Sequence, residues 1–136
     1  MLYFDSQDYV NIGIKSRIEK SVIAEGLRVS RSVEAYFRFL VTRSWPLKEI
    51  AHHSIRGGGK DDLKVLDKDK IKEYVEYTIT SWNDYYEKPA KDRIIPPSSF
   101  PDKTRHFRQK LAQLCGDINR GIRKGTIKPD SEFAQS

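Results

Sequence analysis

Three segments of the chain carry apolar residues at the spacing of an α-helix, and this limits the fold more than any other feature of the sequence. In the last segment the apolar side chains are 4, 3, 4 and 4 residues apart, at Phe107, Leu111, Leu114, Ile118 and Ile122. A helix places residues with this spacing on one side, and that side has to be buried. We therefore predict a helix from about Thr104 to Lys124, ended by Gly125.

Two earlier segments show the same spacing. From Asp69 to Tyr86 one side of the helical wheel carries Ile71, Val75, Ile79, Trp82, Tyr85 and Tyr86, with Tyr74 at its margin. The other segment begins near residues 30–32 and carries Val33, Tyr36, Phe37, Leu40 and Val41. Pro46 ends it, and residues 47–53 can hold a further short helical piece. We expect the helix over 69–86 to be the central one, with aromatic residues of all three helices in the core.

The N-terminal region begins with a strand pattern. From Tyr9 to Ile14 apolar and polar residues alternate, which is typical of a half-buried strand. Ser16 is followed three residues later by Glu19, and this pair forms a capping box. The pattern predicts a short strand and then a helix from Ser16 to about Gly26.

Together these patterns predict an all-α, or α-rich, fold. We expect a bundle of four to five helices with one short N-terminal strand, built as a single domain over residues 1–136. Loops are predicted at 54–68, which contains three consecutive glycines, and at 88–103, which contains four prolines. Residues 126–136 are predicted to form a flexible tail.

The composition indicates a soluble protein. The mean hydropathy is −0.67, and the sequence has neither an apolar run near 20 residues nor a signal-peptide pattern at its start. We therefore expect a cytoplasmic protein that does not contact membranes. The single cysteine, Cys115, falls among apolar positions of a predicted helix, so we expect a buried thiol and no internal disulfide.

No residue pattern predicts a catalytic, metal or cofactor site. The tract from Gly57 to Lys60 departs twice from a P-loop, although its backbone N–H groups could meet a phosphate. His52 and His53 are adjacent and would point about 100° apart on a helix, which disfavours a shared metal ion. Arg105 and His106 suit ribonuclease chemistry but lack partners in the sequence. We expect no enzyme activity, with a small ribonuclease as an alternative.

The positive charge lies in two blocks. Residues 1–60 carry 10 Lys+Arg and 6 Asp+Glu, residues 61–100 carry 7 and 9, and residues 101–136 carry 8 and 4. Basic helices of this kind bind phosphate backbones by releasing counterions. The predicted contacts to DNA or RNA are Arg17, Arg28, Arg31, Arg38, Arg43, Arg105, Arg108, Arg120, Arg123 and Lys124. Such a protein could also have protein partners, as an accessory subunit of a nucleoprotein complex.

Residues 9–43 resemble the ribbon-helix-helix family of DNA-binding proteins. The resemblance rests on an alternating strand over residues 10–14, a capped helix from Ser16, and an apolar second helix opened by residues 29–32. It implies a homodimer whose paired strands enter the major groove, with Asn11 and Lys15 facing the bases. A third hypothesis is an adaptor module without any nucleic-acid role. The adaptor predicts that the two basic blocks fold to different sides, whereas nucleic-acid binding predicts one continuous positive face.

Overall fold

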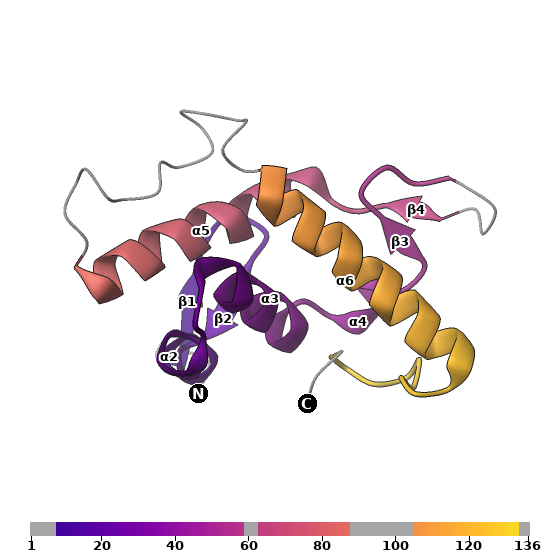
Figure 1. Cartoon of the computed structure of the whole chain (residues 1–136), viewed down its shortest axis with the longest axis horizontal. Coiled ribbons are helices and arrows are strands. Elements are labelled where there is room, and N and C mark those ends of the chain that lie inside the picture. The colour runs from indigo at the N-terminus through magenta and orange to yellow at the C-terminus, as the bar shows by residue number, and fades with distance from the viewer. Residues whose placement is uncertain (1–7, 59–62, 88–104, 134–136) are drawn as a thin grey trace.

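A computed structural model of the chain describes residues 8–58, 63–87 and 105–133 (Figure 1). Within these ranges the chain is rich in helix, with five helices and two pairs of short strands. This confirms the α-rich expectation. The connector predicted at 88–103 lies outside the described residues. No helix within the described ranges is both long enough and apolar enough to cross a bilayer.

The helix at the centre is α3, Val33–Ser44. It starts where predicted, because the Ser32 hydroxyl accepts a hydrogen bond from the backbone N–H of Ala35 at 3.1 Å. It packs against α2 (Lys20–Val29), α5 (Lys68–Tyr86) and α6 (Arg105–Lys124). The prediction that the helix over 69–86 is central was therefore wrong, because α3 is the helix that contacts the other three.

Aromatic side chains join α3 to the two long helices, α5 and α6. Tyr36 lies 5.6 Å from Trp82 of α5, measured between ring centroids, and Phe37 meets Phe107 of α6 edge-on at 5.4 Å. The expectation that aromatic residues from these helices form the core is confirmed. Such ring pairs add specific geometry to the free energy gained by burying apolar area.

Helix α5 follows the predicted stripe only in part. Asp67 caps it by accepting hydrogen bonds from the backbone N–H groups of residues 69 and 70. The stripe is buried as far as Trp82, but Tyr85 and Tyr86 are 53% and 44% exposed. Tyr74, predicted at the margin, is 1% exposed because its ring stacks on Trp45 at 5.4 Å.

The N-terminal segment forms a hairpin. Strand β1 (Tyr9–Asn11) pairs antiparallel with β2 (Arg17–Glu19), and Val10 lies opposite Ile18, which is fully buried. The helix predicted from Ser16 therefore begins only at Lys20, because residues 17–19 are extended. The capping box does not form.

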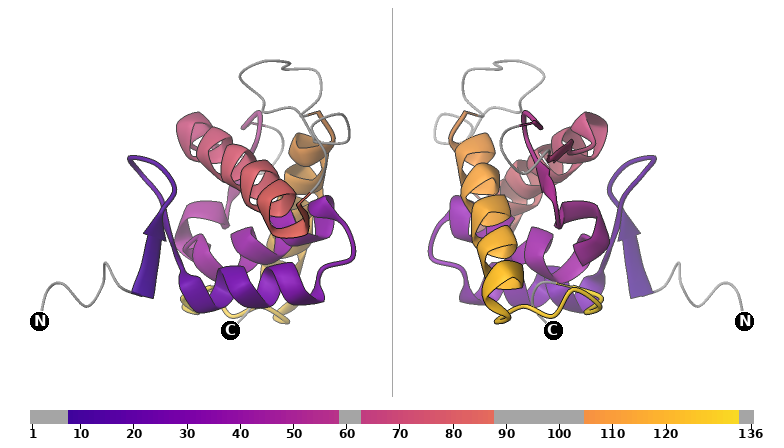
Figure 2. Two further views of the ribbon diagram at one scale, coloured as in Figure 1. Left: turned by 90° about the vertical axis from the view of Figure 1, so that its left-hand side faces the viewer. Right: turned by 90° about the vertical axis from the view of Figure 1, so that its right-hand side faces the viewer.

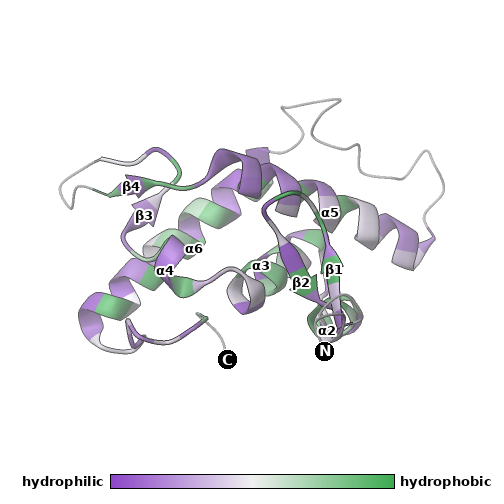
Figure 3. Cartoon of the chain, turned by 180° about the vertical axis from the view of Figure 1, so that it is seen from behind, coloured by the Kyte–Doolittle hydropathy of each residue, from purple (hydrophilic) through white to green (hydrophobic). Residues whose placement is uncertain are grey.

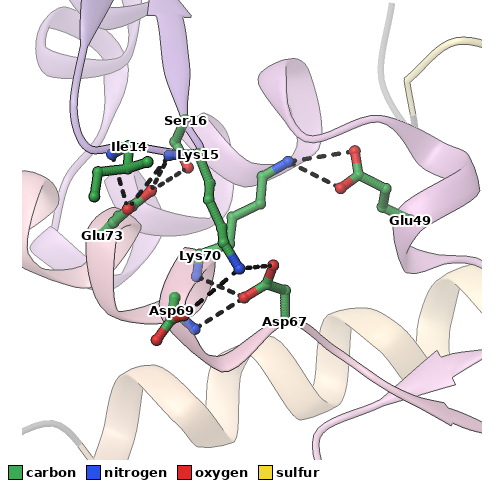
Figure 4. A network of polar contacts seen from close by, with 8 residues as sticks. All are labelled: Ile14, Lys15, Ser16, Glu49, Asp67, Asp69, Lys70 and Glu73. Carbon is green, nitrogen blue, oxygen red and sulfur yellow. Dashed lines mark hydrogen bonds and ion pairs between the residues drawn. The ribbon is translucent and has the colours of Figure 1, made fainter.

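The loop of the hairpin is attached to α5 by polar contacts (Figure 4). The Glu73 carboxylate accepts hydrogen bonds from the backbone N–H of Ile14 at 3.0 Å and from the Ser16 hydroxyl at 2.8 Å. Lys15 Nζ lies 2.9 Å from Asp67 Oδ2. A Cβ added at Gly13 would lie 2.2 Å from Glu73 Cδ, so a side chain there would push the Glu73 carboxylate away from its position beside the loop.

The segment between α3 and α5 contains more structure than the sequence predicts. Helix α4 (Leu47–Ile50) ends earlier than the predicted piece at 47–53. The predicted loop at 54–68 includes three strand residues, because β3 (His53–Ser54) pairs in parallel with β4 (Lys64–Val65). Leu66, which follows β4, is buried in the core.

The C-terminal segment folds back instead of extending as the predicted flexible tail. Gly125 ends α6 with a φ of +81°, as expected. Thr126 N–H then donates to the carbonyl of Gly121 at 2.9 Å, and Leu47 N–H donates to the carbonyl of Glu132 at 2.8 Å. Residues 126–133 therefore lie against α6 and α4, while residues 134–136 are outside the described chain.

Candidate nucleic-acid interface

Helix α6 has the two-sided character that its sequence predicts. Phe107, Leu111, Leu114 and Ile118 are buried, and Ile122 is half-buried. Figure 3 shows hydrophobic and hydrophilic bands alternating along this helix. The predicted cations of α6 are all exposed: Arg105, Arg108, Arg120, Arg123 and Lys124. Its arginines therefore fall into two groups, one in each of its end regions.

A groove of about 970 Å³ lies beside the N-terminal half of α6. Four cations line it, namely Arg56, Lys68, Arg105 and Arg108. The remaining lining residues are Ser54, Ile55, Val65, Gln109 and Ala112. No carboxylate occurs among these described lining residues. We call this feature the cationic groove. One side of it is α6, and the other comes from the β3 and β4 region and the start of α5 (Figure 1).

Asn119 holds the two sides of the groove together. Its side-chain oxygen accepts a hydrogen bond from the backbone N–H of His52 at 2.7 Å, and its amide donates to the carbonyl of His53 at 3.3 Å. His52 has a left-handed φ of 62° at this point. The parallel bonds from Lys64 N–H to the His52 carbonyl and from Leu66 N–H to the Ser54 carbonyl, both 3.0 Å, then place β4. This placement brings Val65 and Lys68 to the groove.

The glycine tract contributes less to phosphate binding than its sequence allows. Gly57 N–H donates to the Ser54 hydroxyl at 2.7 Å, and Gly58 N–H donates to the carbonyl of Leu63, also at 2.7 Å. Both donors are therefore used within the protein. Gly59 and Lys60 lie outside the described residues.

Several predicted cations are held by other contacts. Arg38 of α3 and Arg120 of α6 both bind Asp117, the first at 3.4 Å. The Arg43 guanidinium stacks over the Phe39 ring at 3.8 Å. The N-terminal and C-terminal basic blocks therefore meet between α3 and α6, but through a shared carboxylate that offsets their charge.

The other predicted cations do not join the groove. Arg17 is in the hairpin, with its guanidinium 4.4 Å from the centre of the Tyr9 ring. The hairpin and α6 lie on opposite sides of the molecule in both views of Figure 2. Arg28 is near the end of α2, and Arg31 lies in the turn before α3. The predicted set is thus spread over the surface and does not form the one continuous positive face that we expected of a nucleic-acid-binding protein. Only Arg105 and Arg108 of this set line the groove.

Sequence reasoning missed Arg56 and Lys68. Arg56 directly precedes the glycine tract that was considered for phosphate binding. Its position next to that tract is the one sequence feature that could have indicated Arg56 as a phosphate contact. Lys68 is the first residue of α5 and gives no sign in the sequence that it will face α6. Its position depends on the β3 and β4 pairing, which was not predicted.

Two of the histidines considered for catalysis or metal binding have partners within the protein. His106 Nε2 is 3.2 Å from Glu34 Oε2, and His53 Nδ1 is 2.8 Å from the carbonyl of Ala51. Within the described ranges, no group of three or more His, Cys, Asp or Glu side chains could hold a metal ion. Cys115 is 2% exposed, as predicted, and burial raises the pKa of its thiol to about 11.

The region that resembles ribbon-helix-helix proteins differs from the expected elements. Strand β1 pairs with β2 of the same chain. Lys15, expected to face DNA bases, pairs with Asp67 and lies 3.5 Å from Asp69. Comparison with protein families, curated proteins and solved structures found no significant match to this chain. The ribbon-helix-helix dimer therefore stays a prediction that rests on the sequence pattern.

Proposed function

We propose that this protein binds nucleic acid without catalysing a reaction, by contacts to the phosphate backbone in the cationic groove. It would serve as an accessory subunit of a nucleoprotein assembly. The observation that carries this proposal is the gathering of four cations from three separate segments around one groove, with no carboxylate among its described lining residues. Cations placed in this way gain affinity for a polyanion through counterion release.

Among the described residues, no partner neutralises the cations of the groove. No hydrogen bond or ion pair joins the side chains of Arg56, Lys68, Arg105 or Arg108 to another residue in the described ranges. This contrasts with Arg38 and Arg120, which share Asp117. The proposal therefore narrows the predicted contact set to the groove, with two of its four cations taken from that set.

The position of two of these arginines on α6 also supports an anionic ligand. Arg105 and Arg108 occupy the first turn, which has no acidic residue. The N-terminus of a helix carries a partial positive charge, so cations there are unfavourable for the isolated helix. A phosphate in the groove would offset this repulsion.

Binding is tested by fluorescence anisotropy with labelled single- and double-stranded DNA and RNA at about 50 and 200 mM salt. If four phosphates are neutralised, the affinity should fall about 50- to 150-fold between these conditions. The double variant R105Q/R108Q should bind more weakly and show about half the salt dependence. The matched control is K72Q/K128Q, which removes the same charge outside the groove and should keep both properties near wild type.

Two results would contradict the proposal. One is the absence of salt-dependent binding to every nucleic acid tested. The other is an equal loss in R105Q/R108Q and in K72Q/K128Q, because net charge and not the groove would then explain the affinity.

A further inference from the structure

We infer that the cationic groove takes a single strand of nucleic acid, RNA or DNA, in preference to a duplex. The inference rests on the proposed function and adds the class of ligand. It depends on the size of the groove, on the origin of its cations and on the chemistry of its lining.

The groove is too small to enclose a duplex. A volume of about 970 Å³ corresponds to a cube about 10 Å on a side or a sphere about 12 Å across. A double helix is wider than its own major groove, which is about 12 Å across in B-form DNA, so a duplex can touch only the rim. A single strand can enter.

Cations reach the groove from both of its sides. Arg105 and Arg108 come from α6, whereas Arg56 and Lys68 come from the segments opposite. A single strand that enters between them can bring consecutive phosphates to both pairs. The rigid backbone of a duplex would offer its phosphates to one pair at a time, and fewer counterions would be released.

Three of the five other described lining residues are aliphatic. Ile55, Val65 and Ala112 can contact sugar rings once a strand is inside, and such contacts are closed to a duplex at the rim. The described lining has no aromatic side chain on which a base could stack. The modest base preferences of single-strand binding come from stacking strength and from backbone flexibility. We therefore expect oligonucleotides of different base composition to bind with similar affinity.

The test compares labelled single strands of 12 nucleotides with a hairpin duplex of the same length, using wild type and the variant Ala112→Leu. Ala112 is exposed and lines the groove, so a larger aliphatic side chain there narrows the groove without changing its charge and without adding a ring on which a base could stack. We expect single strands to bind wild type at least about tenfold more tightly than the duplex. A112L should bind single strands several-fold more weakly and keep the weaker duplex binding within about twofold.

Ala35→Leu is the matched control, because Ala35 is an exposed alanine on α3 outside the groove. It should bind as wild type does. Ala112→Met is a second variant that narrows the groove, for use if A112L does not fold. Duplex binding as tight as single-strand binding overturns the inference, and so does a narrowed groove that leaves single-strand affinity unchanged. In both cases salt-dependent binding would persist, which distinguishes them from failure of the proposed function.

Discussion

Glu73 on α5 accepts a 2.8 Å hydrogen bond from the hydroxyl of Ser16, the residue that precedes strand β2. The same carboxylate accepts hydrogen bonds from the backbone N–H groups of Ile14 and Lys15. One side chain thus satisfies the polar groups of the hairpin loop, and a two-stranded hairpin is only marginally stable by itself. The position of the hairpin therefore depends on α5.

Removal of this carboxylate should destabilise the protein. We expect Glu73→Ala to lower the free energy of unfolding by about 1 to 2 kcal/mol, because several charge-assisted hydrogen bonds are lost. Urea unfolding followed by circular dichroism measures the change. Glu76→Ala on the same helix is the control and should cost less than about 0.5 kcal/mol. Equal effects of the two substitutions would show that the hairpin is not held by Glu73.

The ion pair between Lys15 and Asp67 should make the free energy of unfolding depend on pH in the acidic range. The hydrogen bond from Lys15, followed by backbone hydrogen bonds at the start of α5, lowers the pKa of Asp67 below its usual 3.8. This contribution is present above pH 3.8 and is lost as the pH falls through the lower pKa of the folded state. Asp67→Asn keeps a capping side chain but cannot titrate. The stability difference between wild type and D67N, measured from pH 7 to pH 2, should therefore shrink in acid. A difference that does not vary with pH would contradict this assignment.

Cys115 should be unreactive while the protein is folded. Burial raises the pKa of the thiol to about 11, so at pH 8 about one molecule in a thousand carries the reactive thiolate. A thiol-specific disulfide reagent should label the native protein slowly and the denatured protein quickly. Fast labelling under native conditions would mean that the helix around Cys115 opens readily.

The arginines at the start of α6 should lower the free energy of unfolding. We expect Arg105→Gln to raise the free energy of unfolding by about 0.3 to 1 kcal/mol, because it removes a cation from the positive end of the helix. Lys124→Gln is the matched comparison, since Lys124 is in the last turn, where a cation is favourable. It should lower the stability by a similar amount. Thermal unfolding at low ionic strength measures both changes. An R105Q protein that is less stable than wild type would show that Arg105 does not destabilise the folded protein.

Asn119 should affect binding although it carries no charge and does not line the groove. Its two hydrogen bonds hold residues 52 and 53 beside α6. We expect Asn119→Ala to lower the affinity for single strands several-fold at about 50 mM salt, because Arg56 and Lys68 are then no longer held opposite α6. Gln113→Ala, an exposed amide side chain on α6 outside the groove, is the control and should bind normally. Unchanged binding by N119A would show that the groove does not need this contact.

Much of the helical part of the fold could be predicted from periodicity. The predicted starts of the helices that contain Ile71 and Phe107 lie within one residue of the observed starts, and the helix that contains Val33 begins directly after its predicted start region. These predictions succeed because apolar spacing and capping residues act locally. Ser16 and Glu19 show the limit of such local signals. They match a capping box, yet Ile18 gains more by pairing opposite Val10 and entering the core.

Only two of the four cations of the candidate site could be predicted from the sequence. Arg105 and Arg108 follow from the helical wheel of α6, because its buried stripe decides which residues are exposed. Arg56 and Lys68 come to the same groove only through the parallel pairing of β3 with β4 and the contact of Asn119 with residues 52 and 53. These are contacts between residues distant in the sequence, and no local pattern encodes them.

The distance in sequence between the two sides of the cationic groove has a thermodynamic consequence. Arg56 and Arg105 are separated by 48 intervening residues, so the unfolded chain has no equivalent arrangement of charge. An anion that prefers this arrangement will shift the folding equilibrium as well as fill the groove. The melting temperature should therefore report which polyanion fits, and ligands can be ranked by the stability they confer without any label on the nucleic acid.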